Sequence, residues 1–557
     1  MNMGRKVFVI GLDGATFDLI LPWTQAGKLP VLNRLVQGGV HGPLLSTYPP
    51  LTGPAWSSFM TGKSPARHGI LEFFRRQGGS YRQILNNRQD IDGKSLWRCL
   101  SEADKKVGVI GVPLTYPPEP VNGFMITGLL TPPGRRDFTY PPELLEELEA
   151  QVGPYRLRHD EEHRPNNPYP LINEEYAILE NNLQAAMYLI THKPWDFFML
   201  HILGTDRMQH EFWHLLDPNH PDHDPEQLER IGNVVLSFFE RVDAAIGQIL
   251  AALDEKTVVI LMSDHGFGPV YQFINFNTWL LEQGLLRLRR NPDTQLRYLL
   301  FRLGFNYTVL GNWILKLGLG SQAKKMGRAK RQDWQRRVFL SLRDVDWQRS
   351  KVYSMGNFGQ LFINLKGREP NGVVSPGEEY EAVVKDLIRR LEGLTDPASG
   401  ERVIEKIMQR DEIYQGAYAD QAPDVLFFTR NMEYKAMGLS DFSSSKVFEP
   451  VFGTWGHHRM HGILICYGPG VVKDHTQISH ARIQDLAPTI LYLMDQKIPA
   501  DMDGQVLLDI FTDDYRAHQT LQYEAQVGAE DKKEAGQLSE QEEAILADML
   551  RSLGYVN

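Results

Sequence analysis

Seven side chains with metal-binding or nucleophilic chemistry are scattered over more than 440 residues, most of them directly after an apolar run. They are Asp13, Thr52, Asp206, His210, Asp264, His265 and His458. Carboxylates and imidazoles together can hold divalent cations, and a hydroxyl beside such cations can act as a nucleophile. Three Asp, three His and one Thr are what two cations and one nucleophile require. The sequence therefore predicts a metallohydrolase.

The spacing within two of these groups brings their side chains together. Asp206 and His210 are four residues apart, so on a helix both project from one face. Asp264 and His265 are adjacent, and Gly266 lets the chain turn so that both face one site. Mixed carboxylate and imidazole ligands suit Zn²⁺, with Mn²⁺ as the alternative, better than Ca²⁺ or Mg²⁺. Because a single Asp after a strand is more often a helix cap, the prediction depends on the joint pattern.

The elements that must position these residues are short apolar runs alternating with amphipathic stretches. The expected strands are Val7–Leu12, Val107–Val112, Phe124–Thr127, Phe197–Ile202, Val258–Met262, Val425–Phe428 and Gly462–Tyr467. The expected helices include Pro30–Gly38, Leu144–Gln151, Asn173–His192 and Pro225–Leu253. This order predicts an α/β fold with a doubly wound, mostly parallel sheet. Such sheets bind ligands beyond the carboxyl ends of their strands, where Asp13, Asp206 and Asp264 fall.

Composition narrows the class of protein and its compartment. The net charge of -10 argues against nucleic-acid binding, which favours a basic surface. The two cysteines, Cys99 and Cys466, lie far apart in apolar segments, so a disulfide scaffold is not expected. No apolar run reaches the ~18 residues that span a bilayer. Met1–Lys6 runs directly into the strand that precedes Asp13, so no cleavable targeting segment is expected. These features predict a cytoplasmic protein.

The chain divides into four expected parts. Residues 1–272 form the first part of the core, 273–345 an inserted basic helical cap, 346–512 the second part of the core, and 513–557 a polar tail with a terminal helix. Between residues 287 and 343 there are 14 Lys and Arg against two Asp. This basic stretch has three readings: a solvated helical face, a positive rim that draws anionic esters to the site, or an amphipathic segment in peripheral contact with an anionic membrane.

Several motifs around the seven residues resemble the alkaline phosphatase superfamily, specifically its type I phosphodiesterase/nucleotide pyrophosphatase family. The matching segments are Gly11–Gly14, Thr52–Gly62 with Arg67–Ile70, Asp206–His210, Ser263–Gly266, His458–Gly462, and Asp485–Ile490 with Asp501–Gly504. The resemblance covers roughly residues 5–510. It implies an alkaline phosphatase-like core, into which the helical cap expected at residues 273–345 is inserted.

The resemblance also implies a role for each matched position. One metal would be held by Asp13, Thr52, Asp264 and His265, and the second by Asp206, His210 and His458. Thr52, nine positions before Thr61, matches the family nucleophile, with Ser46 and Thr47 as the nearest alternatives. Spacing to Gly462 favours His458 over His457 as the ligand. The absence of a Cys near Thr52 counts against sulfatase chemistry.

The leading hypothesis is a two-metal phosphoric ester hydrolase, a phosphodiesterase or nucleotide pyrophosphatase acting through a metal-activated threonine and a covalent phospho-threonine. Its substrate would be a small phosphate ester, such as a nucleotide or lipid head group. The family often places an Asn shortly after His-Gly-Ile, whereas Ile70 is followed here by Leu71-Glu-Phe-Phe74, which weakens a nucleotide substrate. One alternative is a phosphomonoesterase or phosphotransferase, mutase-like, with Arg67 or Arg459 binding the extra charge. The other is a non-catalytic protein that binds membrane surfaces.

Overall fold

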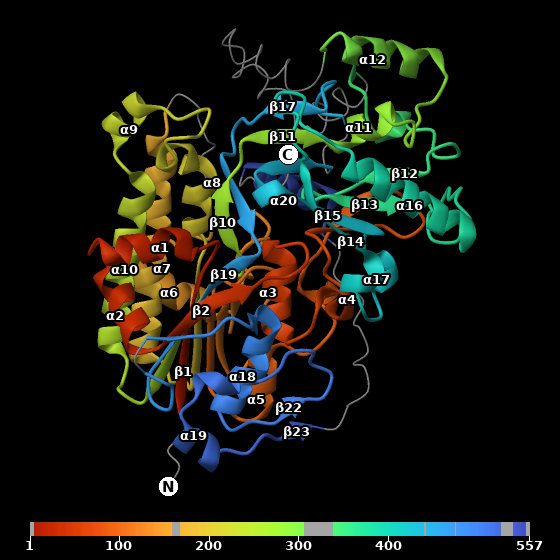
Figure 1. The fold of residues 1–557 in the computed structure, drawn as a ribbon. Coiled ribbons are helices and arrows are strands. Elements are labelled where there is room, and N and C mark those ends of the chain that lie inside the picture. The colour runs from red at the N-terminus through yellow and green to blue at the C-terminus, as the bar shows by residue number, and fades with distance from the viewer. Residues whose placement is uncertain are drawn as a thin grey trace.

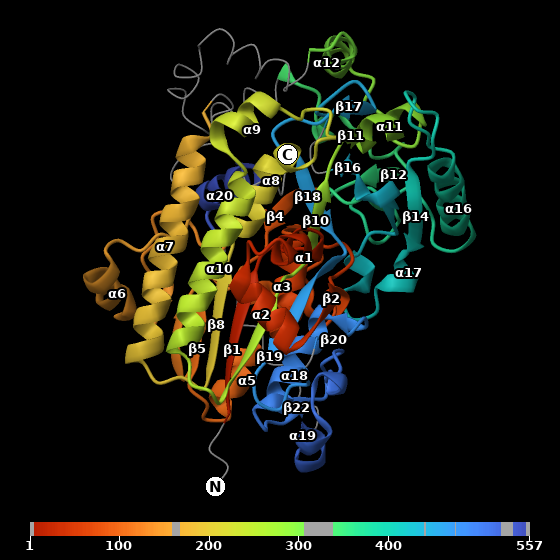
Figure 2. The same cartoon turned by 60° about the vertical axis from the view of Figure 1, so that its left-hand side comes forward.

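A ten-stranded, mostly parallel sheet with helices on both faces forms the centre of the protein (Figures 1 and 2). The computed structural model describes residues 5–158, 167–305, 338–438, 442–473, 475–524 and 538–552. In sheet order the strands are β20 (Thr476–Gln477), β2 (Val40–Leu45), β19 (His461–Tyr467), β9 (Thr257–Met262), β1 (Lys6–Leu12), β8 (Phe197–Ile202), β5 (Val107–Ile110), β6 (Gly123–Ile126) and β7 (Thr139–Tyr140), with β21 (Ala481–Arg482) also paired to β2.

Strand β1 lies in the middle of this sheet and pairs in parallel with both β8 and β9. Its side chains alternate between two cores: Val7 and Val9 point to one face, and Phe8, Ile10 and Leu12 to the other. Because both faces are covered, the strand is apolar throughout, as expected for a parallel strand. Strand β19 runs antiparallel to both of its neighbours, β9 and β2.

The helices form one layer on each face of the central sheet. On the face of Phe8 lie α1 (Phe17–Gln25), α2 (Pro30–Gly38), α6 (Leu144–Val152), α7 (Tyr169–His192), α8 (Gly204–Leu216) and α10 (Val234–Ala252). On the opposite face lie α3 (Thr52–Thr61), α5 (Leu96–Glu102), α18 (Leu486–Leu493) and α20 (Glu540–Ser552). This arrangement confirms the predicted doubly wound α/β fold.

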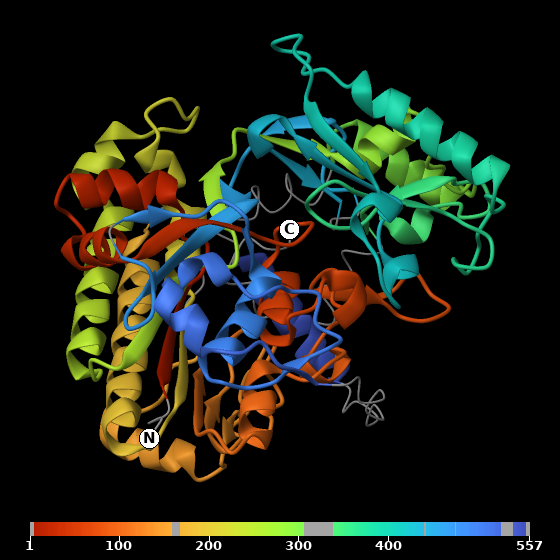
Figure 3. The ribbon, with the colours of Figure 1, turned by 60° about the horizontal axis from the view of Figure 1, so that its bottom comes forward.

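A second unit stands beside the central sheet, as Figure 3 shows. Its strands form a four-stranded sheet in the order β12 (Val352–Ser354), β13 (Gln360–Ile363), β15 (Val425–Thr429) and β14 (Ile404–Gln409), and a three-stranded sheet in the order β16 (Tyr434–Met437), β11 (Gln272–Asn275) and β17 (Phe448–Pro450). Its helices include α11 (Phe276–Glu282), α12 (Pro292–Arg302) and α16 (Glu378–Glu392). This unit has its own hydrophobic core.

The described strands of this second unit correct one part of the sequence prediction. The run Val425–Phe428 was expected in the core of the protein, but as β15 it pairs with β13 and β14 and not with the central sheet. Its full burial arises within the second unit, and an apolar strand pattern does not tell which sheet buries it. The first strand after this unit that belongs to the central sheet is β19. The boundary expected at residue 346, between the cap and the second part of the core, therefore does not mark a change from one sheet to the other.

The expected basic cap is described in part. Residues 306–337 of this cap lie outside the described residues. The described part of the cap that precedes them includes β11, α11 and α12. No helix in the described ranges is long and apolar enough to cross a membrane. The terminal helix expected near Ser539 is α20, which packs Leu546 and Leu550 into the core on the same face of the central sheet as α3.

Candidate active site

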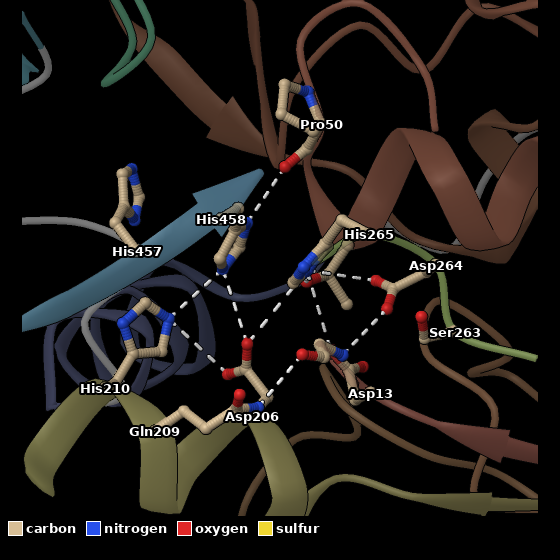
Figure 4. A network of polar contacts seen from close by, with 12 residues as sticks. Asp13, Pro50, Asp206, Gln209, His210, Ser263, Asp264, His265, His457 and His458 are labelled. Carbon is tan, nitrogen blue, oxygen red and sulfur yellow. Dashed lines mark hydrogen bonds and ion pairs between the residues drawn. The ribbon is translucent and has the colours of Figure 1, made fainter. Parts of the chain in front are cut away.

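Five segments bring all seven predicted residues together beyond the carboxyl ends of the central strands, and Figure 4 labels all of them except Thr52. Asp13 follows β1, Thr52 begins α3, Asp206 and His210 lie on α8 after β8, Asp264 and His265 join β9 to β10 (Gly266–Pro269), and His458 lies on β18 (Gly456–Arg459). Strands β10 and β18 pair antiparallel, with Phe267 opposite His458. Each of the seven side chains is buried, at no more than 1% exposure.

The donor atoms converge in overlapping groups. The His265 Nε2 atom lies 3.2 Å from Asp264 Oδ2 and 3.6 Å from Asp13 Oδ1. On the other side, the carboxylate of Asp206 has Oδ1 3.4 Å from His458 Nε2 and Oδ2 3.5 Å from His210 Nε2. Asp206 Oδ1 and His265 Nε2, 4.0 Å apart, join the two sides. Three groups bring their donor atoms within 4.8 Å of one another, close enough to hold a metal ion: Asp13, Asp264 and His265; Asp206, His265 and His458; and His210, His457 and His458.

The three imidazole rings are oriented by backbone carbonyl oxygens. Nδ1 of His210 lies 2.8 Å from Gly456 O, and Nδ1 of His458 lies 2.9 Å from Pro50 O. Nδ1 of His265 lies 3.1 Å from Gly266 O. A carbonyl only accepts, so each Nδ1 carries the proton and each Nε2 presents a lone pair to the cluster. This is how metal-binding histidines are held in proteins.

Two of these lone pairs face each other. Nε2 of His210 and Nε2 of His458 are 3.1 Å apart. Since both Nδ1 atoms carry protons, the two Nε2 lone pairs repel each other unless a cation or a proton lies between them. Burial, first of all, and the neighbouring charges lower the pKa of His210 well below its usual value and that of His458 to about 3. A proton is therefore excluded at neutral pH, and the pair fits a metal cation.

The carboxylates of Asp13 and Asp264 fit cations for the same reason. Each has one oxygen that accepts hydrogen bonds, whereas Asp13 Oδ1 and Asp264 Oδ2 have no hydrogen-bond partner among the described residues. Burial and then the neighbouring carboxylates raise the pKa of both groups well above the usual value. Buried carboxylates this close to one another are stable as anions only beside positive charge. The chemistry of the donor set is thus that of a divalent metal site.

Thr52 places its hydroxyl in this cluster. Its Oγ1 lies 3.2 Å from His265 Nε2, which accepts the hydroxyl proton because the other ring nitrogen is already a donor. Thr52 is also the first residue of α3, where the partial positive charge of a helix N-terminus favours an anion. Of the nearby alternatives, Thr47 donates its hydroxyl to Pro49 O, 2.8 Å away, whereas Ser46 Oγ has no hydrogen-bond partner among the described residues.

His457 and His458 point in different directions, as consecutive residues of a strand do. His458 belongs to the cluster, whereas the His457 ring turns away from Asp206 in Figure 4 and stacks on Phe358, with ring centroids 4.4 Å apart. The donor atom of His457 nevertheless lies within 4.8 Å of those of His210 and His458, so the preference for His458 over His457 stays a prediction.

Two residues that the sequence analysis missed hold Asp13 in place. Asp13 Oδ2 lies 2.8 Å from His201 Nε2 and accepts a hydrogen bond of 3.2 Å from Trp56 Nε1. Burial lowers the pKa of His201 to about 3, so the ring is neutral and donates to the carboxylate. His201 lies on β8 within an otherwise apolar strand, and that isolated polar residue was the available signal.

A third missed residue comes from the second unit. Lys435 on β16 is 1% exposed, and burial lowers its pKa to about 7, against the opposing effect of Asp206. Its charge also acts on His210 and His457. No local pattern marks Lys435, because more than 200 residues separate it from Asp206. The second unit therefore adds positive charge beside the cluster.

The two arginines considered as phosphate ligands are both engaged elsewhere. Arg67 pairs with Asp503, with Nη1 and Oδ1 2.8 Å apart, and is half exposed. Arg459 donates to the backbone carbonyls of Pro269 and His457, which fastens β18 to β10. Neither guanidinium is available to bind a phosphate beside Thr52 without losing these bonds.

Comparison with known proteins agrees with the fold and the motifs. The sequence matches the family described as type I phosphodiesterase / nucleotide pyrophosphatase over residues 7–462. Human ectonucleotide pyrophosphatase / phosphodiesterase 5 has a similar structure, with a TM-score of 0.50 and 12% identity over 91% of this chain and 100% of that one. Phosphonoacetate hydrolase from Sinorhizobium meliloti, solved with phosphonoformate, has a TM-score of 0.50 and 13% identity over 87% of this chain and 94% of that one.

No curated protein matches the sequence of this chain. The family match nevertheless spans most of its length and contains all seven clustered residues. It supports an enzyme that hydrolyses phosphoryl bonds in the manner of phosphodiesterases and pyrophosphatases. The chain belongs to the type I phosphodiesterase / nucleotide pyrophosphatase family.

Proposed function

We propose that the protein is a metal-dependent phosphodiesterase that uses Thr52 as its nucleophile and acts on small phosphate esters. The observation that carries the proposal is the ring of buried donors around the Thr52 hydroxyl, in which two Nε2 lone pairs face each other at 3.1 Å. The site fits two divalent cations, Zn²⁺ in the first place and Mn²⁺ as the alternative, because its donors mix carboxylates with imidazoles.

The ligand assignment follows the two sides of the cluster. Asp13, Thr52, Asp264 and His265 would hold one cation, and Asp206, His210 and His458 the other. When bound, such cations lower the pKa of a coordinated hydroxyl and neutralise charge on the phosphoryl group. Trp56 and His201 fix the Asp13 carboxylate, so that its other oxygen remains directed into the site.

The reaction divides into two steps at Thr52. First, the Oγ1 atom forms a bond to phosphorus while the bond from phosphorus to the leaving alcohol breaks, and the hydroxyl proton finally resides on that alcohol. This leaves a phospho-threonine that still carries the second ester group. Water then attacks phosphorus, the bond to Oγ1 breaks, and Thr52 regains its hydroxyl proton. His265 orients the hydroxyl at the start of the cycle.

The engagement of Arg67 and Arg459 by other partners favours a diester over a monoester as the substrate. A monoester carries one more negative charge than a diester, and sites for it usually add a further cationic group. Arg67 and Arg459, the candidates for that role, are engaged by Asp503 and by backbone carbonyls. A phosphomonoesterase or phosphotransferase remains the second candidate function, because buried Lys435 places positive charge beside Asp206.

The substrate class is a small phosphate ester. Family membership and the phosphonoacetate hydrolase, which was solved with phosphonoacetate and with phosphonoformate, support a compact phosphoryl or phosphonyl ligand. The family often places an Asn that favours nucleotides shortly after the His-Gly-Ile motif, whereas Leu71-Glu-Phe-Phe74 follow it here, so a lipid head group or another alcohol is an equal candidate.

Peripheral membrane contact and a cytoplasmic location stay predictions. In the described part of residues 287–343, α12 exposes Leu296 at 58% and Leu299 at 56%, and Leu303 after it is 75% exposed. Exposed arginines, among them Arg302, flank this apolar stripe. An anionic lipid surface suits such a face. A non-catalytic protein that only bound membrane surfaces would not need the buried donor cluster.

The test compares a chromogenic diester, bis(4-nitrophenyl) phosphate, with 4-nitrophenyl phosphate, using protein loaded with Zn²⁺ or Mn²⁺. We expect kcat/KM for the diester to exceed that for the monoester by about tenfold or more, which is ~1.4 kcal/mol of transition-state stabilisation. A preference for the monoester would overturn the phosphodiesterase proposal in favour of the second candidate. Metal-loaded protein that turns over neither ester would contradict both.

A further inference from the structure

His457 is the one residue of the three donor groups that the ligand assignment above leaves without a role. It is 3% exposed, and neither Nδ1 nor Nε2 has a hydrogen-bond partner among the described residues. The three other histidines of these groups each have Nδ1 at a backbone carbonyl oxygen. Because a buried polar group without a partner destabilises the fold, an imidazole kept in this state points to a ligand of its own.

The donor nitrogen of His457 lies close to the two imidazoles on its side of the cluster. It is within 4.8 Å of the donor atoms of His210 and His458, whose Nε2 atoms are 3.1 Å apart. Tetrahedral Zn²⁺ binds imidazole nitrogens at about 2.0–2.1 Å, which sets two such nitrogens about 3.4 Å apart. The three nitrogens can therefore share one ion after a side-chain movement of no more than about 1.4 Å.

The three rings are also spaced as ligands of one ion are. The centroids of His210 and His458 are 5.1 Å apart, and that of His457 lies 4.9 Å from His458 and 5.8 Å from His210. Imidazoles on one tetrahedral ion have centroids about 5 Å apart, because each ring lies at the same distance from the ion. Phe358 stacks on one face of the His457 ring, with centroids 4.4 Å apart, and helps to hold it in place.

The charges around the three histidines favour a cation among them. The Asp206 carboxylate attracts one, since its Oδ1 lies 3.4 Å from His458 Nε2. The ammonium group of Lys435, which acts on His457 as well, opposes it. Three carboxylates belong to the donor groups, so negative groups outnumber this ammonium. The balance is therefore negative before any cation binds.

The type of ligand distinguishes the two cations. We call the place of Asp13, Thr52, Asp264 and His265 the first position, and that of Asp206, His210 and His458 the second. Oxygen donors dominate the first position and suit Mn²⁺ as well as Zn²⁺. With His457, the second position has one carboxylate and three imidazoles, a nitrogen-rich set that suits Zn²⁺. Zn²⁺ can take a fifth ligand, so four protein donors do not close this position to a substrate.

We propose that His457 is a fourth protein ligand of the cation in the second position and makes that position selective for Zn²⁺ over Mn²⁺. The proposal rests on the proposed function only in requiring the two cations, and it does not depend on which ester is hydrolysed. It adds a metal ligand that the resemblance to the family does not imply.

Proton NMR of the protein loaded with Co²⁺ in both positions counts the bound histidines. Paramagnetic Co²⁺ shifts the exchangeable N–H proton of each coordinated imidazole far outside the ordinary range. The wild type should show four such protons, one from each histidine of the two positions, and His457→Phe should show three. His41→Phe, which replaces a buried histidine of β2 outside the donor groups, should keep four. Three shifted protons in the wild type would overturn the proposal.

Competition with a chromogenic chelator tests the selectivity. His457→Phe should weaken Zn²⁺ binding at the second position by about 10- to 100-fold, at least the cost of losing an outer hydrogen bond to a ligand. Binding of Mn²⁺, which depends less on imidazole, should weaken by less than about threefold. Phe preserves the stack on Phe358, and thermal unfolding checks that the variant folds. An equal weakening of the two metals, which a purely structural role predicts, would overturn the selectivity.

The number of bound ions separates a shared position from an additional one. At saturating Zn²⁺ the wild type and His457→Phe should both bind two equivalents, because Asp206, His210 and His458 remain in the variant. A third equivalent in the wild type, lost in His457→Phe, would show a separate site and overturn the shared position.

None of these measurements needs turnover, so the proposal and the proposed function can fail separately. Four shifted protons in a protein that hydrolyses no diester would support His457 as a ligand and overturn the proposed function. Three shifted protons in a protein that hydrolyses diesters would overturn the ligand and leave the proposed function standing.

Discussion

Glu72 and Gln360, 288 residues apart, are joined by a hydrogen bond of 2.9 Å from Gln360 Nε2 to Glu72 Oε2. Gln360 in turn accepts a hydrogen bond from the backbone N–H of Phe358, 2.9 Å away. The loop after the His-Gly-Ile motif is thus fastened to the loop that carries Phe358 over His457 and His458. This pair joins the segment after the motif to the second unit at the edge of the site.

The first prediction concerns the pH dependence of stability at Glu72. Burial raises its pKa to about 7, although hydrogen bonds from Phe73 N and Gln360 oppose this. The unfolded chain loses the proton near pH 4.5, whereas the folded protein keeps it until about pH 7. The contribution of Glu72 to the free energy of unfolding is therefore greatest below pH 4.5 and is lost as the pH rises to 7. Glu72→Gln should remove this fall of roughly 3 kcal/mol.

Urea unfolding at pH 4.5 and pH 8 measures this difference. Glu119→Gln is the matched control, in which the pH dependence of stability should have the opposite sign. The ion pair with Arg88 outweighs the effect of burial and lowers the pKa of Glu119. That control should lose stability at pH 8 more than at acidic pH. If Glu72→Gln and the wild type show the same change between the two pH values, Glu72 is not protonated in the folded protein.

The second prediction distinguishes the two adjacent histidines by metal content. His458→Ala should bind one equivalent of Zn²⁺ fewer than the wild type, because its Nε2 belongs to the donor cluster. His457→Ala should retain the full metal content, since its ring turns away from Asp206. Elemental analysis after loading and gel filtration gives both values. An equal loss in the two variants would contradict the assignment of His458 as the ligand.

The third prediction concerns the residues that orient Asp13. Trp56→Phe removes the indole N–H that donates to Asp13 Oδ2, and the affinity for metal should fall by about 10- to 100-fold. Competition with a chromogenic chelator measures the change. Trp97→Phe removes an equivalent bond to Glu119 away from the cluster and should leave the affinity unchanged. An unchanged affinity in Trp56→Phe would show that His201 alone orients the carboxylate.

The sequence predicted the central strands and the donor cluster because both depend on local patterns. Polar residues directly after apolar runs must meet at one edge of a parallel sheet, and Asp13, Asp206 and Asp264 do so. The motifs shared with the family identified Thr52 and His458 in the same way. The short runs at these strand ends are sufficient to locate the cluster.

What remained hidden depends on contacts between distant segments. Strand β15 has the same apolar pattern as a central strand, and only its partners β13 and β14 show that it belongs to the second unit. Lys435 and Gln360 reach the site or its edge through the docking of that unit, for which no local pattern exists. His201 was hidden for another reason, since a single His in a buried strand is more often a packed residue than part of a site.

The fourth prediction concerns the exposed stripe on α12. Replacing Leu296, Leu299 and Leu303 together by Ser should lower binding to vesicles with a 1:1 mixture of phosphatidylglycerol and phosphatidylcholine by about tenfold or more, since each leucine buries apolar surface. Co-sedimentation measures it. The control replaces Leu521 and Tyr523, exposed near the other end of the protein, and should bind as the wild type does. No binding of the wild type to anionic vesicles would contradict membrane contact.

The central claim is that Thr52 is the nucleophile at a two-metal site. The most direct measurement is the steady-state hydrolysis of bis(4-nitrophenyl) phosphate by wild type and Thr52→Ala, each with its metal content determined on the same sample. We expect kcat to fall by about 10³-fold or more in Thr52→Ala, with the fold intact and at least the cation on His210 and His458 retained. Turnover within about tenfold of the wild type would contradict the account and move the nucleophile to another residue.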